Sequence, residues 1–129
     1  MLMTNDLFET ATARRARDRT APTIESANFN QSIAFTEGHP FELSVITDGR
    51  PAPEVCWIKD GKRLEESLGQ RVQILDDGRS HRVVASQADE THEGNWTVIA
   101  SNPSGLVTMS TRAEVLSARD FPADRRPNR

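Results

Sequence analysis

The chain has little of what marks several large classes of protein. It contains one cysteine in 129 residues and cannot form an intrachain disulfide, which favours a reducing compartment or a fold that stands without a bridge. No apolar run approaches the roughly 18 residues that a membrane-spanning helix needs. The first twenty residues lack the order of a basic region, an apolar stretch and a small-residue cleavage site that marks a secretory signal. These absences favour a cytoplasmic protein without membrane contact.

The sequence also lacks the patterns of common catalytic and metal sites. It has no glycine-rich phosphate loop, and His39, His81 and His92 do not have metal-ligand spacing. His81 is expected on a half-buried strand face as a hydrogen-bonded core or rim residue. The acid pairs Glu65–Glu66 and Asp76–Asp77 are interpreted as solvated turn residues. We therefore predict no enzyme activity, no cofactor and no metal site.

Charge is distributed unevenly along the chain. Residues 1–20 and 117–129 each carry four arginines, whereas residues 21–116 carry eight basic and fourteen acidic side chains. An acidic central region is a poor electrostatic match to nucleic acid, so no nucleic-acid partner is expected. The basic cluster "RRARDR" (14–19) is interpreted as a solvated tail. Residues 1–20 and 118–129 are predicted to be flexible extensions of a single domain over 21–117.

Short alternating segments separated by turn signals fill the central domain. Phe41, Leu43 and Val45 share one face of the first clear segment, as expected of a half-buried strand. Only residues 86–94 break this pattern, and they are expected to form one helical turn. The same alternation predicts these further inward residues: Val55 and Trp57; Val72 and Ile74; His81, Val83 and Ala85; Trp96, Val98 and Ala100; Val107, Met109, Ala113 and Val115.

At least six strands are predicted, and seven or eight if "PTIES" and "SIAF" pair at the edges. An open parallel sheet needs crossover helices, and no connection here is long enough to hold one. The fold class is therefore all-β, a two-sheet antiparallel sandwich.

These residues resemble an immunoglobulin domain of the intermediate (I-set) type. The resemblance covers residues 21 to about 117 and implies an immunoglobulin-like sandwich without a disulfide. Its motif elements, in chain order, are Glu37-Gly38, Gly49-x-Pro51-x-Pro53, Trp57-x-Lys59-Asp60-Gly61, "RVQIL", an Asp-Gly turn and "GNWTVIASNPSG".

The family's two disulfide positions correspond to Val45 and Val98 in this chain. Two buried valines contribute roughly 1.5–3 kcal/mol each, whereas loss of a native disulfide costs a small domain about 2–5 kcal/mol, so the exchange is tolerable. We expect the two valines to touch across the sheets beside Trp57. Cys56 is out of phase with Trp57, and it is interpreted as an unreactive thiol facing away from the core.

A second departure concerns the tyrosine corner, where the family uses a tyrosine hydroxyl to bind upstream backbone. Trp96 takes that position here. An indole donates one hydrogen bond and accepts none, so the corner is expected to be held mainly by packing. His92 replaces the family's aspartate, which puts its usual ion pair with Arg71 in doubt.

The missing cysteines make the chain similar to the intracellular modules of giant muscle and cytoskeletal proteins. That similarity implies a non-catalytic link and docking surface in the cytoskeleton or sarcomere. Its partners would be neighbouring immunoglobulin or fibronectin-type domains and other cytoskeletal proteins, and the isolated domain would be monomeric. One alternative is an extracellular adhesion module, favoured by the glycosylation sequons at Asn30 and Asn95. The other is a module attached to a kinase or exchange factor.

The last predicted strand, 106–115, is the expected docking edge, because its early part is uncharged and rich in β-formers. The alternative is that Leu106 and Met109 close the core against the first strand. An acidic surface around Glu65, Glu66, Asp76 and Asp77 is expected to be a secondary site for a basic partner. The edge residues proposed for binding are Leu106, Val107, Thr108, Met109 and Ser110.

Overall fold

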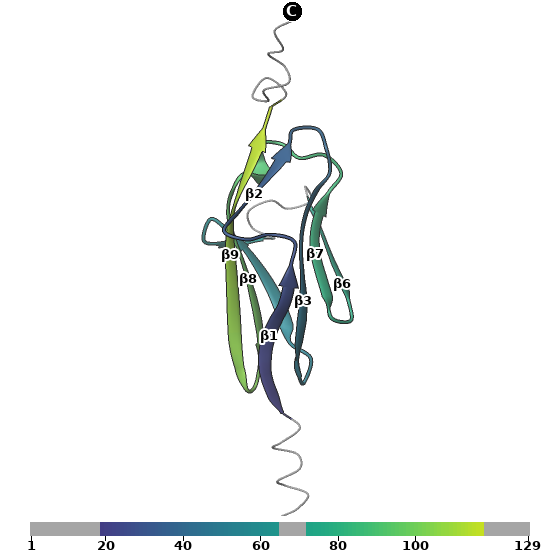
Figure 1. The fold of residues 1–129 in the computed structure, drawn as a ribbon, viewed down its shortest axis with the longest axis vertical. Helices are drawn as coiled ribbons and strands as arrows, with labels where there is room; N and C mark the ends of the chain where they lie inside the picture. The colour runs from purple at the N-terminus through teal and green to yellow at the C-terminus, as the bar shows by residue number, and fades with distance from the viewer. Residues whose placement is uncertain (1–18, 65–71, 118–129) are drawn as a thin grey trace, which may run out of the picture.

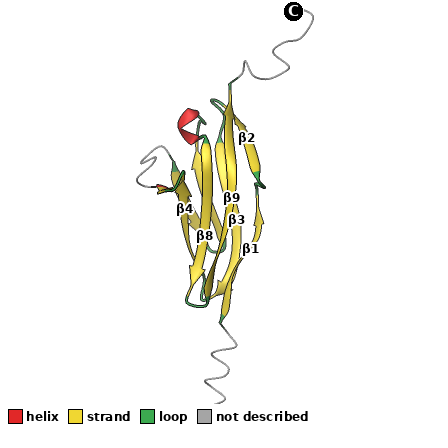
Figure 2. Cartoon of the chain, turned by 90° about the vertical axis from the view of Figure 1, so that its left-hand side faces the viewer, coloured by secondary structure: helices red, strands yellow, loops and turns green. Residues whose placement is uncertain are grey.

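The computed structural model describes residues 19–64 and 72–117, which form two facing β-sheets (Figures 1 and 2). A short 3₁₀ helix, η2 (Glu90–His92), precedes β8 and confirms the helical turn predicted within 86–94. The strands are β1 (Thr20–Ala27), β2 (Ser32–Thr36), β3 (Phe41–Arg50), β4 (Glu54–Lys59), β5 (Lys62–Arg63), β6 (Gln73–Asp77), β7 (Ser80–Ala85), β8 (Gly94–Asn102) and β9 (Gly105–Leu116).

The strand order confirms the two-sheet sandwich. One sheet runs β1-β3-β7-β6 and the other runs β2-β9-β8-β4-β5. The sheets are antiparallel except that β2 pairs with β9 in parallel, because the chain changes sheets between β1 and β2. Asn28 ends the β1–β3 pairing by exchanging side-chain hydrogen bonds with Glu42 O and the Ser44 N–H, each 2.8 Å long. Phe29, only 4% exposed, then enters the core as the chain crosses.

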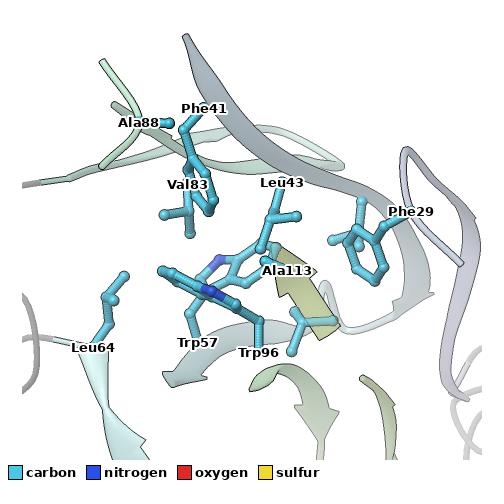
Figure 3. Packing of buried hydrophobic residues seen from close by; sticks show 11 residues of the cluster. Phe29, Phe41, Leu43, Trp57, Leu64, Val83, Ala88, Trp96 and Ala113 are labelled. Carbon is cyan, nitrogen blue, oxygen red and sulfur yellow. The ribbon is translucent and has the colours of Figure 1, made fainter. Parts of the chain in front are cut away.

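The core lies between the sheets and follows the predicted alternation. Phe41, Leu43 and Val83 are fully buried, and both tryptophan rings lie in the same packed layer (Figure 3). The expectation for Ile74 was wrong, since this side chain is 42% exposed. Its strand, β6, lies at the edge of its sheet and is exposed along its whole length.

Val45 and Val98 lie in the same core cluster, one in each sheet. Each is 1% exposed, and both belong to the cluster that contains Trp57. Val98 is the cross-strand partner of Trp57 on β4, whereas Val45 comes from β3 in the opposite sheet. Direct contact between the two valines stays a prediction.

Trp96 supplies the corner hydrogen bond that a tyrosine hydroxyl would otherwise make. Its indole Nε1–H donates to the carbonyl of His92 at 2.8 Å, and the ring is 1% exposed. The indole thus donates the one hydrogen bond open to it, and the expectation that packing mainly holds this corner stays a prediction. One donor suffices because the corner needs a bond to an upstream carbonyl, and an accepting oxygen has no part in it.

His92 is buried beneath the same corner. Its ring stacks on Phe41 with centroids 4.9 Å apart, and its Nδ1 accepts a hydrogen bond from the backbone N–H of Asp89 at 3.0 Å. The Asp89 carboxylate in turn accepts the Thr91 N–H at 2.8 Å. It also accepts the N–H of His92, which completes a capping box around η2. The histidine thus fixes the loop before β8. Arg71, the arginine of the family's ion pair, lies outside the described residues.

Asp60 joins the turn after β4 to the start of β8. Its N–H donates to the Asn95 carbonyl at 2.7 Å, and its carboxylate accepts the Asn95 N–H at 2.9 Å and Lys59 Nζ at 2.7 Å. A Cβ at Gly94, where φ is +149°, would lie 2.6 Å from the carboxylate, so only glycine fits this close approach. The Lys59 hydrogen bond, followed by the Asn95 N–H, lowers the pKa of Asp60 below its ordinary value of 3.8.

This lowered pKa predicts a pH-dependent contribution to stability. A carboxylate with a depressed folded pKa stabilises the fold above its unfolded pKa, and the contribution is lost as the pH falls through the folded value. We expect Asp60→Asn to be less stable than the wild type at pH 7 and the difference to shrink below about pH 3.8. Urea unfolding at pH 7 and pH 3 measures this. Asp77→Asn, which removes an exposed acid from β6, is the matched control; equal behaviour of the two variants would contradict the prediction.

Candidate docking surface

On the side away from β8, strand β9 pairs with another described strand over only part of its length. It pairs with β8 from Gly105 to Ala113, but β2 lies beside it only from Arg112 to Leu116. Among the described residues, no strand pairs with the outer side of β9 between Gly105 and Thr111. The last strand is therefore an edge in its first half, as predicted, and an interior strand in its second half.

The free backbone groups of this edge can be assigned from the register. The N–H of Arg112 points away from β8, because it donates to the carbonyl of Gln31 at 2.9 Å. The β8–β9 register continues without a bulge from Arg112 back to Gly105, and backbone groups alternate in direction along a strand. Leu106, Thr108 and Ser110 therefore direct their N–H and C=O groups to the open side.

The side chains of the edge divide into two sets. Leu106 is 66% exposed, and Thr108 and Ser110 are exposed as well. Val107 and Met109 are half-buried, and Met109 packs against the core. The alternative that Leu106 and Met109 both close the core thus holds for Met109 but not for Leu106.

The outer face of the same sheet is uncharged beside this edge. Two cross-strand rows run from β4 through β8 to β9, and Thr97 Oγ1 and Ser110 Oγ share a hydrogen bond of 2.9 Å. Cys56 lies in one row as a half-buried free thiol, on the opposite face of β4 from buried Trp57. The rows are Cys56–Ile99–Thr108 and Ile58–Thr97–Ser110.

An open depression lies on β8 and β9 beside the start of β2. Its volume is about 420 Å³, and Arg112 supplies its positive charge. With the adjoining edge, it offers a partner backbone groups to pair with and a recess for one side chain. Its lining residues are Gln31, Asn95, Thr97, Ser110, Thr111 and Arg112.

The predicted acidic surface is only partly described. Glu65 and Glu66 lie outside the described residues, while Asp76 and Asp77 are exposed on β6. Asp76 Oδ1 lies 2.7 Å from Nδ1 of His81, whose ring is mostly buried. His81 is therefore a hydrogen-bonded strand histidine, as expected, and it engages one of the two acids.

Residues 19–64 and 72–117 contain no group of three or more His, Cys, Asp or Glu side chains placed to hold a metal ion. In the same part of the chain, no helix has the length and apolar character needed to cross a membrane.

Comparison with known proteins identifies a family, relatives and solved structures that are similar to this chain. The model of the immunoglobulin I-set domain matches residues 22–115. Human hemicentin-1 is 34% identical over 84 residues, which are 65% of this chain and 1% of that protein. The muscle M-line assembly protein unc-89 of Caenorhabditis elegans is 30% identical over 113 residues, 88% of this chain and 1% of that protein. The chain therefore spans about one hundredth of the length of either relative.

Among solved structures, titin domains Z1Z2 in complex with telethonin are similar to this chain. The TM-score is 0.68 at 27% sequence identity, and the match covers 75% of this chain and 48% of the titin chain.

Proposed function

The chain belongs to the immunoglobulin I-set family, and we propose that it is a non-catalytic link and docking module of a cytoskeletal or sarcomeric protein. The observation that carries this proposal is the open half of β9. There, three residues direct outward backbone groups that pair with no other described strand, beside an uncharged face. The match to a muscle M-line assembly protein over 88% of the chain supports the cytoskeletal setting. The described domain is proposed to be a monomer.

The role as a link follows from where the chain enters and leaves the domain. The first residue of β1 and the last residue of β9 lie at opposite ends of the sandwich (Figure 1). Tension applied to the two ends would therefore run along the strands from one end of the domain to the other. This arrangement suits a module joined in series with neighbouring domains.

The role as a docking module rests on strand addition. An extended segment of a partner can form main-chain hydrogen bonds to a free sheet edge, and pockets beside the edge then select side chains. Titin domains crystallised in complex with telethonin share this fold, which is consistent with an I-set domain that binds another protein. We infer that the partner here presents an uncharged, extended segment to Leu106–Ser110.

Proline at Thr108 tests the docking role. Thr108→Pro removes an outward N–H while leaving the hydrogen bonds to β8 in place, so we expect capture of partners from muscle extract to fall sharply. Thr108→Ala keeps the N–H and is the matched control, which should bind like the wild type. Both variants must show the wild-type circular dichroism spectrum. Undiminished capture by Thr108→Pro would mean that the domain acts as a spacer or binds elsewhere.

An extracellular adhesion module is the second candidate. The sequon residue Asn95 is exposed on β8, so the neighbouring buried tryptophan does not prevent attachment of a glycan there. The absence of a disulfide disfavours this candidate. Intact-mass measurement of the protein from its native source decides between the two, since a glycan at Asn95 requires passage through the secretory pathway.

A further inference from the structure

The first residue of β1 follows a dense run of arginines. Thr20 comes after "RRARDR", with Arg15 five residues and Arg17 three residues before it. Basophilic serine/threonine kinases select substrates by such upstream guanidinium groups, which pair with carboxylates beside the kinase active site.

The structure leaves the Thr20 hydroxyl accessible. Thr20 is exposed at the start of an edge strand, and its hydroxyl has no hydrogen-bond partner among the described residues. The pairing of β1 with β3 is interrupted directly after Thr20 by a register shift that extends to Thr23. Few backbone bonds therefore have to open for a kinase to hold this residue in an extended conformation.

The cationic side chain of Arg50 lies across from Thr20 in the sheet. Thr20 and Arg50 are cross-strand partners in the antiparallel β1–β3 pair, so their side chains project from the same face with Cβ atoms about 5 Å apart. Arg50 is exposed and forms no ion pair with any described residue. A phosphate on Thr20 would thus meet a guanidinium that no described acid engages, and a guanidinium binds phosphate oxygens with charge-assisted hydrogen bonds.

We propose that Thr20 is phosphorylated by a basophilic serine/threonine kinase and that Arg50 receives the phosphate. In this step the Thr20 oxygen forms a bond to the γ-phosphorus of Mg-ATP, and the bond from that phosphorus to the bridging oxygen breaks. ADP leaves, and the hydroxyl proton passes to the catalytic carboxylate of the kinase.

The phosphate would lie at the end of the domain where β1 begins. The Thr20 carbonyl already accepts a hydrogen bond from Asn102 Nδ2 at 2.8 Å, and the same amide donates to Pro51 O at 2.9 Å. A phosphate carrying −1.5 to −2 charge adds a tie to Arg50 on β3. Phosphorylation would therefore fasten the start of β1 more firmly to the domain.

Phosphorylation of the full 129-residue chain with Mg-ATP and a purified kinase that requires arginine at both upstream positions tests the site. We expect one phosphate, mapped to Thr20 by mass spectrometry and lost in Thr20→Ala. Arg17→Ala should lower kcat/KM about tenfold or more, because it removes a charge-assisted contact to the kinase. Thr23→Ala, on the same strand, should leave incorporation unchanged. Wild-type incorporation in Thr20→Ala would overturn the proposal.

Phosphorus NMR tests the role of Arg50. The second pKa of the phosphothreonine, about 6 for an unperturbed group, should be lower in the wild type than in Arg50→Gln, because the guanidinium favours the dianion. Arg63→Gln, a change of an exposed arginine on β5, is the control and should leave this pKa at its wild-type value. Equal values in the wild type and Arg50→Gln would refute the phosphate–Arg50 contact.

Discussion

Replacing Trp57 with alanine is expected to lower the free energy of unfolding by about 3–5 kcal/mol. The side chain is 3% exposed and lies between the sheets among the largest residues of the core (Figure 3). Its removal forfeits the burial of a large apolar ring and leaves a cavity that two hydrogen-bonded sheets cannot readily close. A domain of this size is stable by only about 5–15 kcal/mol, so the variant should sit close to its unfolding threshold.

Equilibrium urea unfolding followed by circular dichroism measures the effect, with two matched variants. Trp57→Phe keeps most of the volume and loses an indole N–H that has no partner among the described residues, so its loss should be only about 1–2 kcal/mol. Ile58→Ala changes a half-buried residue on the outer face of the same strand and should cost about 1 kcal/mol or less. A Trp57→Ala loss as small as that of Ile58→Ala would show that the core is not organised around this ring.

The double variant Val45→Cys with Val98→Cys is expected to form a disulfide and to raise the free energy of unfolding by about 2–4 kcal/mol. The two valines are buried in one cluster and come from opposite sheets, at the positions where related domains have their cysteines. A bond between them would close a long loop and thereby restrict the unfolded chain. The gain is expected only if the Cβ atoms are within disulfide reach, roughly 3.5–4.5 Å.

Thiol titration and urea unfolding, with and without reductant, test this result. Under reducing conditions the double variant should be no more stable than the wild type, because two thiols replace two well-packed isopropyl groups. Cys56 must first be replaced by serine in both proteins, so that the native thiol cannot form the wrong bond. Two titratable thiols persisting under oxidising conditions would mean that the valines do not face each other, and the proposed correspondence with the family's cysteines would fail.

The sequence by itself predicted the six central strands and most of their inward faces, but it did not predict the two-residue strand β5. The alternation of Phe41, Leu43 and Val45 predicted a buried row because side-chain direction in a strand depends only on position along it. The Asp60–Gly61 turn was equally local, since a positive φ at consecutive residues favours these residue types. The resemblance to I-set domains came from the order of such local signals, and it led to the correct fold without any knowledge of which strands pair.

The tertiary structure decided the features that depend on residues distant in sequence. The open half of β9 exists because Asn28 and Phe29 move the chain to the second sheet, so that β2 begins only beside Arg112. Ile74 has the alternation of an inward residue, yet its exposure followed from the place of β6 at a sheet edge. The stacking of His92 on Phe41 required the loop before β8 to pack against the start of β3. The pairing of Thr20 with Arg50 required the register of two strands. The alternation of residues along a strand determines which face a side chain lies on, whereas the pairing and packing of the strands determine which residues it contacts.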